Sequence, residues 1–103
     1  MSHQPVSPDV RVVREKLDAL RQLSRDRIAI LPQATDTEVS VEGKRHQLVV
    51  WHENRGSGEE WVVVQLYRPA GPGAVRRVHG EGFAVSTRGD HRALTAAEVQ
   101  FTR

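Results

Sequence analysis

The sequence of 103 residues contains no cysteine, one methionine and two phenylalanines. Without cysteine, disulfide scaffolds, thiolate nucleophiles and cysteine-ligated zinc sites are excluded. No apolar run approaches the ~20 residues that a helix needs to cross a bilayer, and the first residues lack the apolar stretch of a signal peptide. We therefore expect one cytoplasmic domain, because a second domain would have too little core of its own.

Lysine is also scarce: of the 15 basic residues, Lys16 and Lys44 are the two lysines and 13 are arginines. The acidic residues number 13, so the formal net charge is only +2. Six basic and four acidic residues in segment 1–31 give +2, three and six in 32–60 give −3, and six and three in 61–103 give +3. This distribution argues against a uniformly basic DNA-coating surface and favours a local arginine patch.

The first element predicted along the chain is a helix. Residues 1–6 form a polar lead-in that we expect to be flexible. Residues 7–9 (Ser-Pro-Asp) combine a cap, a first-turn proline and an acid at the positive end of the helix dipole. One apolar stripe follows at helical spacing, formed by Val10, Val13, Leu17 and Leu20. We predict a helix over about 8–25 that covers a sheet, and residues 28–31 form either its last buried turn or a short strand.

Beyond the helix the apolar pattern changes to a period of two, which is typical of half-buried strands. It predicts an antiparallel sheet within about 37–102, whose first strands lie at 38–42, 45–53 and 59–68. Residues 75–87 fit either two short strands or one long strand with a glycine bulge. Alternation at 99–101 predicts a terminal strand, although Thr95 and Glu98 also match a helix capping box.

These signals predict a single α+β domain spanning residues 1–103. One N-terminal helix packs on a four- to six-stranded antiparallel sheet, and the strands follow the helix as a meander. This order of elements resembles the general layout of cystatin-like domains, a likeness of architecture without signature residues.

Hairpin register assigns the strand residues to two faces. The register assumes a turn at Gly43-Lys44 and a five-residue loop at 54–58. The first face, here called the aliphatic face, carries Val39, Val41, Leu48, Val50, Val62, Val64 and Leu66. The second, the aromatic face, carries Gln47, Val49, Trp51, Trp61, Val63, Gln65 and Tyr67. The same register makes Trp51 and Trp61 direct cross-strand partners.

An aromatic face is costly to leave in water, so it needs a cover or a partner. One interpretation is ordinary core, covered by a curled sheet, by residues 28–31 or by the later apolar residues Val75, Val78, Phe83 and Val85. A second is a homodimer interface anchored by Trp51 and Trp61.

The third interpretation is a ligand platform. Aromatic side chains on a sheet with arginines at the border resemble, in physical type, surfaces that stack single-stranded bases. The candidate binding residues are Trp51, Trp61, Tyr67, Arg68, Arg76 and Arg77. The neighbouring Glu53, Glu59 and Glu60 count against it, because carboxylates repel phosphate.

The chain shows no catalytic or metal-binding pattern. Its five histidines lack the standard metal spacings, and its three Gly-x-Gly pairs match neither a dinucleotide fingerprint nor a P-loop. We therefore expect a small non-catalytic binding or assembly module without metal or cofactor, whose first candidate partner is nucleic acid or another acidic molecule. The alternatives are a cone-shaped α+β domain that holds a small molecule, with or without catalysis, and a structural homodimer subunit.

Overall fold

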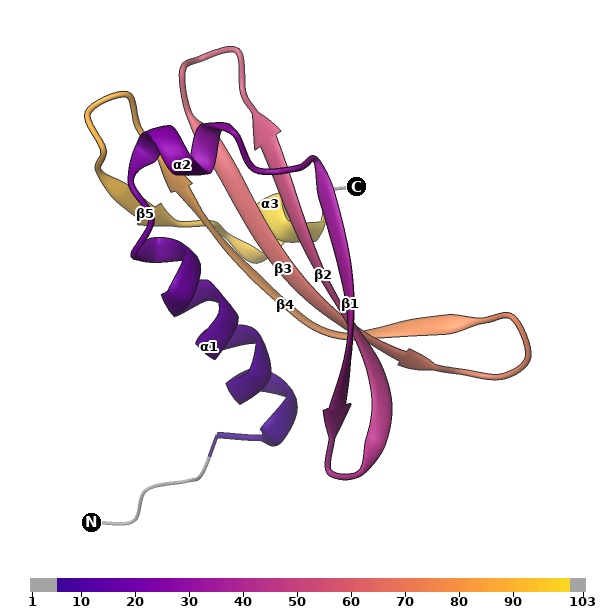
Figure 1. The fold of residues 1–103 in the computed structure, drawn as a ribbon. Helices are drawn as coiled ribbons and strands as arrows, with labels where there is room; N and C mark the ends of the chain where they lie inside the picture. The colour runs from indigo at the N-terminus through magenta and orange to yellow at the C-terminus, as the bar shows by residue number, and fades with distance from the viewer. Residues whose placement is uncertain (1–5, 101–103) are drawn as a thin grey trace, which may run out of the picture.

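The computed structural model describes residues 6–100 and confirms the α+β class. Two helices precede the strands and a short helix follows them (Figure 1). The elements are α1 (Pro8–Arg21), α2 (Arg25–Ala29), β1 (Ala34–Val41), β2 (Lys44–Asn54), β3 (Glu60–Pro69), β4 (Val75–Val85), β5 (His91–Ala93) and α3 (Ala96–Gln100). The strands form one antiparallel sheet in the order β1-β2-β3-β4-β5. None of the helices between residues 6 and 100 has the length and hydropathy needed to cross a bilayer.

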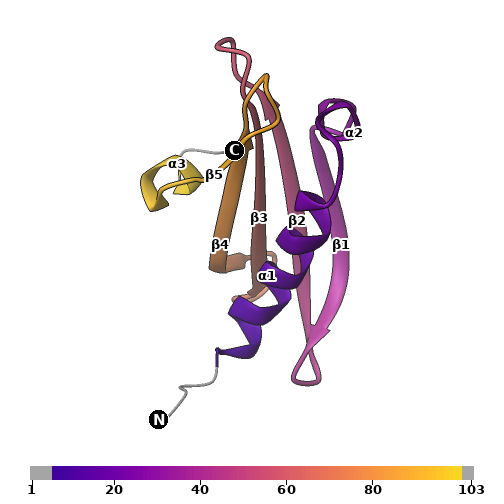
Figure 2. The same ribbon diagram turned by 90° about the vertical axis from the view of Figure 1, so that its left-hand side faces the viewer.

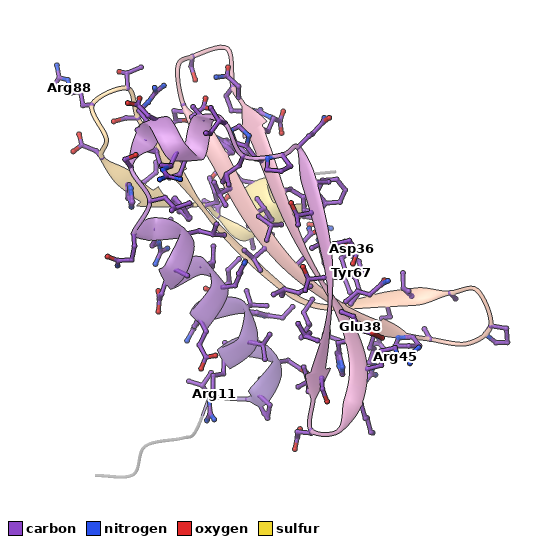
Figure 3. All side chains as sticks on the ribbon, viewed as in Figure 1. Arg11, Asp36, Glu38, Arg45, Tyr67 and Arg88 are labelled. Carbon is purple, nitrogen blue, oxygen red and sulfur yellow. The ribbon has the colours of Figure 1, made fainter. Side chains whose placement is uncertain are left out.

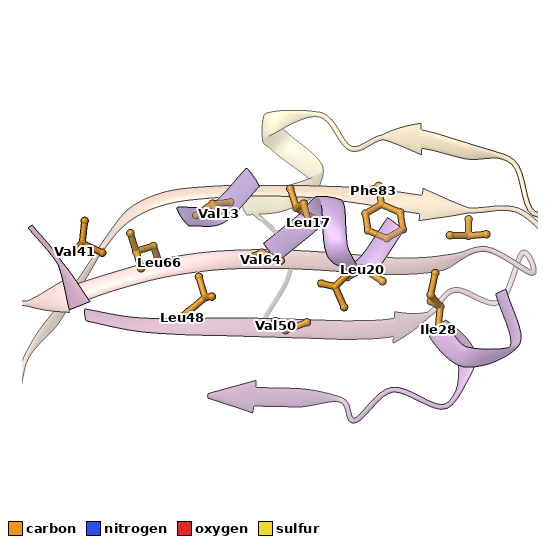
Figure 4. Close-up of a cluster of buried hydrophobic side chains, with 12 residues drawn as sticks. Val13, Leu17, Leu20, Ile28, Val41, Leu48, Val50, Val64, Leu66 and Phe83 are labelled. Atoms are coloured by element: carbon orange, nitrogen blue, oxygen red, sulfur yellow. The ribbon is translucent and has the colours of Figure 1, made fainter. Parts of the chain in front are cut away.

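The core lies between the sheet and α1 with α2 (Figure 4). The predicted aliphatic face is confirmed, because six of its seven residues are buried there and Val39 packs against them half-buried. Val13, Leu17 and Leu20 of α1 cover this face. Since burial of each such side chain contributes ~1.5–3 kcal/mol, this layer is the main source of stability.

The helix boundaries follow from two serine caps. Ser7 caps α1 as predicted and accepts a hydrogen bond from the Val10 amide at 3.3 Å. The predicted end near residue 25 is wrong, because Ser24 caps a separate helix and accepts from the Arg27 amide at 3.3 Å. That helix, α2, decides between the alternatives for residues 28–31: Ile28 is a buried helical residue and not part of a strand.

Both predicted hairpin registers are wrong by two residues. The first turn is Glu42-Gly43, with Val41 opposite Lys44, and the second loop is 55–59. Because side chains alternate with a period of two, a two-residue shift leaves every residue on its predicted face.

The shift does change the cross-strand partners. Trp51 lies opposite Val63, and Trp61 lies opposite Glu53, so the predicted Trp51–Trp61 pair does not form.

The β1–β2 turn carries local backbone strain at Glu42. Both turn residues have positive φ, +51° at Glu42 and +75° at Gly43, as in the tight turns that suit a twisted hairpin. Glutamate pays a steric cost in this conformation, whereas asparagine tolerates it. We expect Glu42→Asn to raise the free energy of unfolding by up to about 1 kcal/mol, measured by urea denaturation. Gly43→Ala is the opposite control, and an unchanged or lowered stability of Glu42→Asn would contradict the strain.

The region 75–87 contains one long strand, β4, rather than two short ones. Its bulge does not lie at the glycines: Leu66 pairs with His79 and Tyr67 with Arg77, which leaves Val78 as the extra residue.

The predicted terminal strand at 99–101 is wrong for its described part, and Phe101 lies outside the described residues. Residues Thr95 and Glu98 instead form the capping box of α3, with reciprocal hydrogen bonds of 2.9 and 3.1 Å. Val99 of this helix is 6 % exposed and packs on the sheet at Gly80, where an added Cβ would lie only 3.2 Å from the Val99 side chain.

Most of the apolar residues expected to cover the aromatic face lie elsewhere, and Val75, which lines a recess on that face, is 59 % exposed. Ile28, Phe83 and Val85 all belong to the core on the opposite face, and Val78 packs against that core. Figure 2 shows α3 alone on the other side of the sheet, over β4. α3 does not cover the part of the aromatic face that lies on β1 and β2, where Trp51 is only half-buried.

Candidate functional site

Trp61 is covered by the chain's own arginines. Its side chain is buried, with the Arg55 and Arg92 guanidinium carbons 4.2 and 5.8 Å from the ring centroid. The indole N–H donates to Glu59 at 3.3 Å. Glu59, one of the three glutamates expected to repel phosphate, thus accepts a hydrogen bond from Trp61 itself.

Arg92 also ties α3 to the sheet through Glu59 and Glu98. It donates to Glu59 at 3.0 and 3.1 Å and to both Glu98 oxygens at 3.2 Å. These bonds and the Thr95 backbone N–H lower the pKa of Glu98 to about 2, and bonds from Arg92 and Trp61 lower the pKa of Glu59. The carboxylates therefore favour the folded state only while they are ionised.

This lowered pKa predicts acid sensitivity. The stabilisation by Glu98 is fully present above its ordinary pKa of 4.5 and is lost as the pH falls towards the folded-state value of about 2. We expect Glu98→Gln to flatten the dependence of Tm on pH in this interval, measured by thermal denaturation followed by circular dichroism. Glu15→Gln, at an exposed position of α1, is the control. Equal pH profiles for wild type and Glu98→Gln would contradict the assigned role.

Trp51 and Tyr67 are brought together by Gln65. The Gln65 side-chain oxygen accepts from the Trp51 indole N–H at 2.7 Å and from the Tyr67 hydroxyl at 2.8 Å. Gln65 is 1 % exposed, while both aromatic side chains are half-buried. Trp61 lies six residues from Tyr67 along β3, which is about 20 Å. The predicted aromatic residues therefore form two groups. Trp51 and Tyr67 share a hydrogen-bond acceptor, and Trp61 is buried at a separate place on the sheet.

A notch opens where two hairpins separate. β2 and β3 stop pairing at Gln47 and Tyr67, and beyond them the β1–β2 and β3–β4 hairpins diverge (Figure 1). We call the space between them the inter-hairpin notch. It contains a recess of about 870 Å³ on the side of α1 and one of about 450 Å³ on the aromatic face. The two recesses share Arg45, His46, Arg68 and Pro69.

The helix-side recess has an excess of cations. Its basic residues come from both hairpins and are Lys44, Arg45, Arg68 and Arg76, whereas its acids are Asp9 and Glu42. Arg45 pairs with Glu38, and Asp9 lies 3.8 Å from the buried His46 ring. Among residues 6–100, no acid lies within ion-pair distance of Lys44, Arg68 or Arg76.

The recess on the aromatic face has a different character. Besides the four shared residues, it is lined by Asp36, Glu38, Gln47, Tyr67 and Val75. Figure 3 shows Asp36, Glu38, Arg45 and Tyr67 gathered at this end of the sheet. The notch therefore has a cationic side and a side that combines carboxylates with an aromatic ring.

The notch unites only part of the predicted site. Tyr67, Arg68 and Arg76 line it, and Trp51 is linked to Tyr67 through Gln65. Arg77 lies opposite Tyr67 but lines a separate recess of about 370 Å³ beside α3. Sequence reasoning missed Lys44, Arg45, His46 and Gln65. The adjacent basic pair at the first turn and the glutamine within a valine-rich strand were the available signals.

A second polar cluster lies at the other end of β2 and β3. Glu60 is 1 % exposed, its Oε1 lies 2.9 Å from Nε2 of His52, and its Oε2 accepts from the Asn54 amide. Nδ1 of His52 donates to the Leu31 carbonyl at 3.0 Å. This cluster fastens the segment that links α2 to β1.

The space between α1 and the sheet is filled by the core side chains, which counts against a ligand held between helix and sheet. Comparisons with family models, curated proteins and solved structures gave no match.

Proposed function

We propose that the chain is a non-catalytic binding module that holds an acidic partner, with nucleic acid as the first candidate, in the inter-hairpin notch. One observation carries the proposal: Lys44, Arg68 and Arg76 converge from two hairpins on one recess, and no acid among residues 6–100 pairs with them. Guanidinium groups suit this role because their planar N–H donors bind phosphate or carboxylate bidentately.

Neighbouring cations that form no ion pair repel one another, and a bound anion relieves this repulsion. Because the three side chains are solvent-exposed, the attraction is screened by salt. For a single-stranded nucleic acid, three phosphate contacts predict a slope of log K against log salt of about −2.

The test is fluorescence anisotropy with a labelled 20-nucleotide oligonucleotide and with labelled heparin, at low and high salt. We expect R68A/R76A to weaken binding of both polyanions and to reduce the oligonucleotide salt slope by about 1.4. R11A/R88A is the matched control, because it removes the same charge from exposed positions that line neither recess (Figure 3). Absence of binding at low salt, or equal binding by both double variants, would refute the proposal.

The alternatives have less support. A homodimer anchored by both tryptophans would have to displace Arg55 and Arg92 from Trp61. A doubled mass in light scattering that is lost in Trp51→Ala would favour it. The cytoplasmic location expected from the composition stays a prediction.

A further inference from the structure

We infer that the acidic partner is a single strand of nucleic acid that crosses the end of the sheet through the inter-hairpin notch. Its phosphates lie in the helix-side recess, and one of its bases packs on Tyr67 in the recess of the aromatic face. This inference rests on the proposed function and specifies the chemical class of the partner.

The inter-hairpin notch is continuous from one face of the sheet to the other. The two recesses lie on opposite faces of the sheet but share Arg45, His46, Arg68 and Pro69. A flexible single strand can occupy both recesses by passing between the hairpins. A duplex keeps its bases paired and stacked, so it cannot present one to a side chain on the far face.

Charge is distributed unequally across the notch. The helix-side recess has four basic residues against two acids, whereas the other recess shares two of these arginines and balances them with Asp36 and Glu38. A polymer with an anionic group on every unit, such as heparin or an acidic peptide, would bring its charges against these carboxylates. A nucleic acid strand alternates anionic phosphates with uncharged bases, so its two components match the two sides.

The Tyr67 ring is held in a fixed orientation beside the recess. The hydroxyl group is held by Gln65 at 2.8 Å, and the half-buried side chain lines the recess. An aromatic ring in a fixed position loses little freedom when a base stacks on it, and such stacking is tolerant of base identity. The amide of Gln47 in the same recess offers both a donor and an acceptor to a base edge.

The test compares three probes: a labelled 20-nucleotide single strand, its duplex and heparin. We expect Tyr67→Leu to weaken single-strand binding about 10-fold, as loss of one stacking contact does, and to leave heparin binding unchanged. Tyr67→Phe keeps the ring but loses its hydrogen bond to Gln65, so it should lose much less single-strand binding than Tyr67→Leu. In a Trp61→Phe background, Trp51 is the only tryptophan, and the single strand should quench its fluorescence.

The outcomes separate the inference from the proposed function. If Tyr67→Leu binds the single strand like wild type, or if the duplex binds as tightly as the single strand, the inference fails, while the effect of R68A/R76A still supports an acidic partner. If R68A/R76A is without effect on any probe, the proposed function fails as well. Thermal denaturation verifies that each variant is folded.

A second variant avoids dependence on Tyr67. D36N alters an exposed position of β1, removes a carboxylate from the aromatic-face recess and leaves the Glu38–Arg45 ion pair intact. We expect it to strengthen heparin binding more than single-strand binding, because a polymer with a charge on every unit places more anionic groups against this carboxylate. An equal gain for both probes would overturn the argument from unequal charge and the inference with it.

Discussion

Phe83→Ala is expected to lower the free energy of unfolding by about 3–5 kcal/mol, because it empties the centre of the helix–sheet core. Phe83 is 0 % exposed. Its ring lies 5.4 Å from the Arg21 guanidinium carbon of α1 and 5.2 Å from the centroid of the β5 residue His91. One side chain therefore joins a helix, β4 and the last strand.

In a domain of this size the loss corresponds to a decrease in Tm of about 15–30 °C, which differential scanning calorimetry measures directly. Ile30→Ala is the control: it also truncates a large apolar side chain, but this one is 76 % exposed. The control should change stability by no more than about 0.5 kcal/mol. If the two variants were equally stable, Phe83 could not occupy the core position described.

Glu60→Ala is the second large effect, because Glu60 is itself buried and its carboxylate holds the mostly buried His52 side chain. The Glu60 carboxylate contacts His52 and Asn54, and the His52 side chain is only 9 % exposed. Breaking a buried pair by removal of one member costs about 3–5 kcal/mol, much of it from the polar group left behind. Chemical denaturation monitored by tryptophan fluorescence measures the loss.

Glu60→Gln is the matched control. A glutamine side chain has nearly the same shape, so its amide can still reach Nε2 of His52 and its oxygen can still accept from Asn54. We expect this variant to keep more than half of the stability that Glu60→Ala loses. Equal losses would mean that the space filled by the side chain matters rather than its hydrogen bonds.

Local patterns in the chain predicted most of the fold. The Ser7 cap, the apolar stripe of α1 and the aliphatic face all depend on neighbours within a few residues, and all are confirmed. The faces were correct despite wrong registers because side-chain direction repeats every two residues, and both errors were two residues long. The predicted pairing of Trp51 with Trp61 was wrong, because a two-residue shift preserves the face of a residue but changes its cross-strand partner.

The candidate site was less accessible to prediction. Arg68 and Arg76 were identified, but the residues opposite them, Lys44 and Arg45, were not. Their proximity depends on where β2 and β3 stop pairing, which neither hairpin sequence specifies alone. The covering of the aromatic face by α3 was likewise missed, since the contact of Val99 with Gly80 joins residues 19 positions apart.

The sequence by itself thus determined the first helix, the first four strands and the faces of the sheet, because helix caps and apolar periodicity act over short distances. It also excluded disulfides by lacking cysteine altogether. Only the tertiary structure decided that two hairpins diverge at Gln47 and Tyr67. It also decided that three cations gather beside this divergence without an acidic ion-pair partner among residues 6–100. The physical reason is that strand pairing, the bulge at Val78 and the twist of the whole sheet set this divergence together, and none of them is a property of one segment.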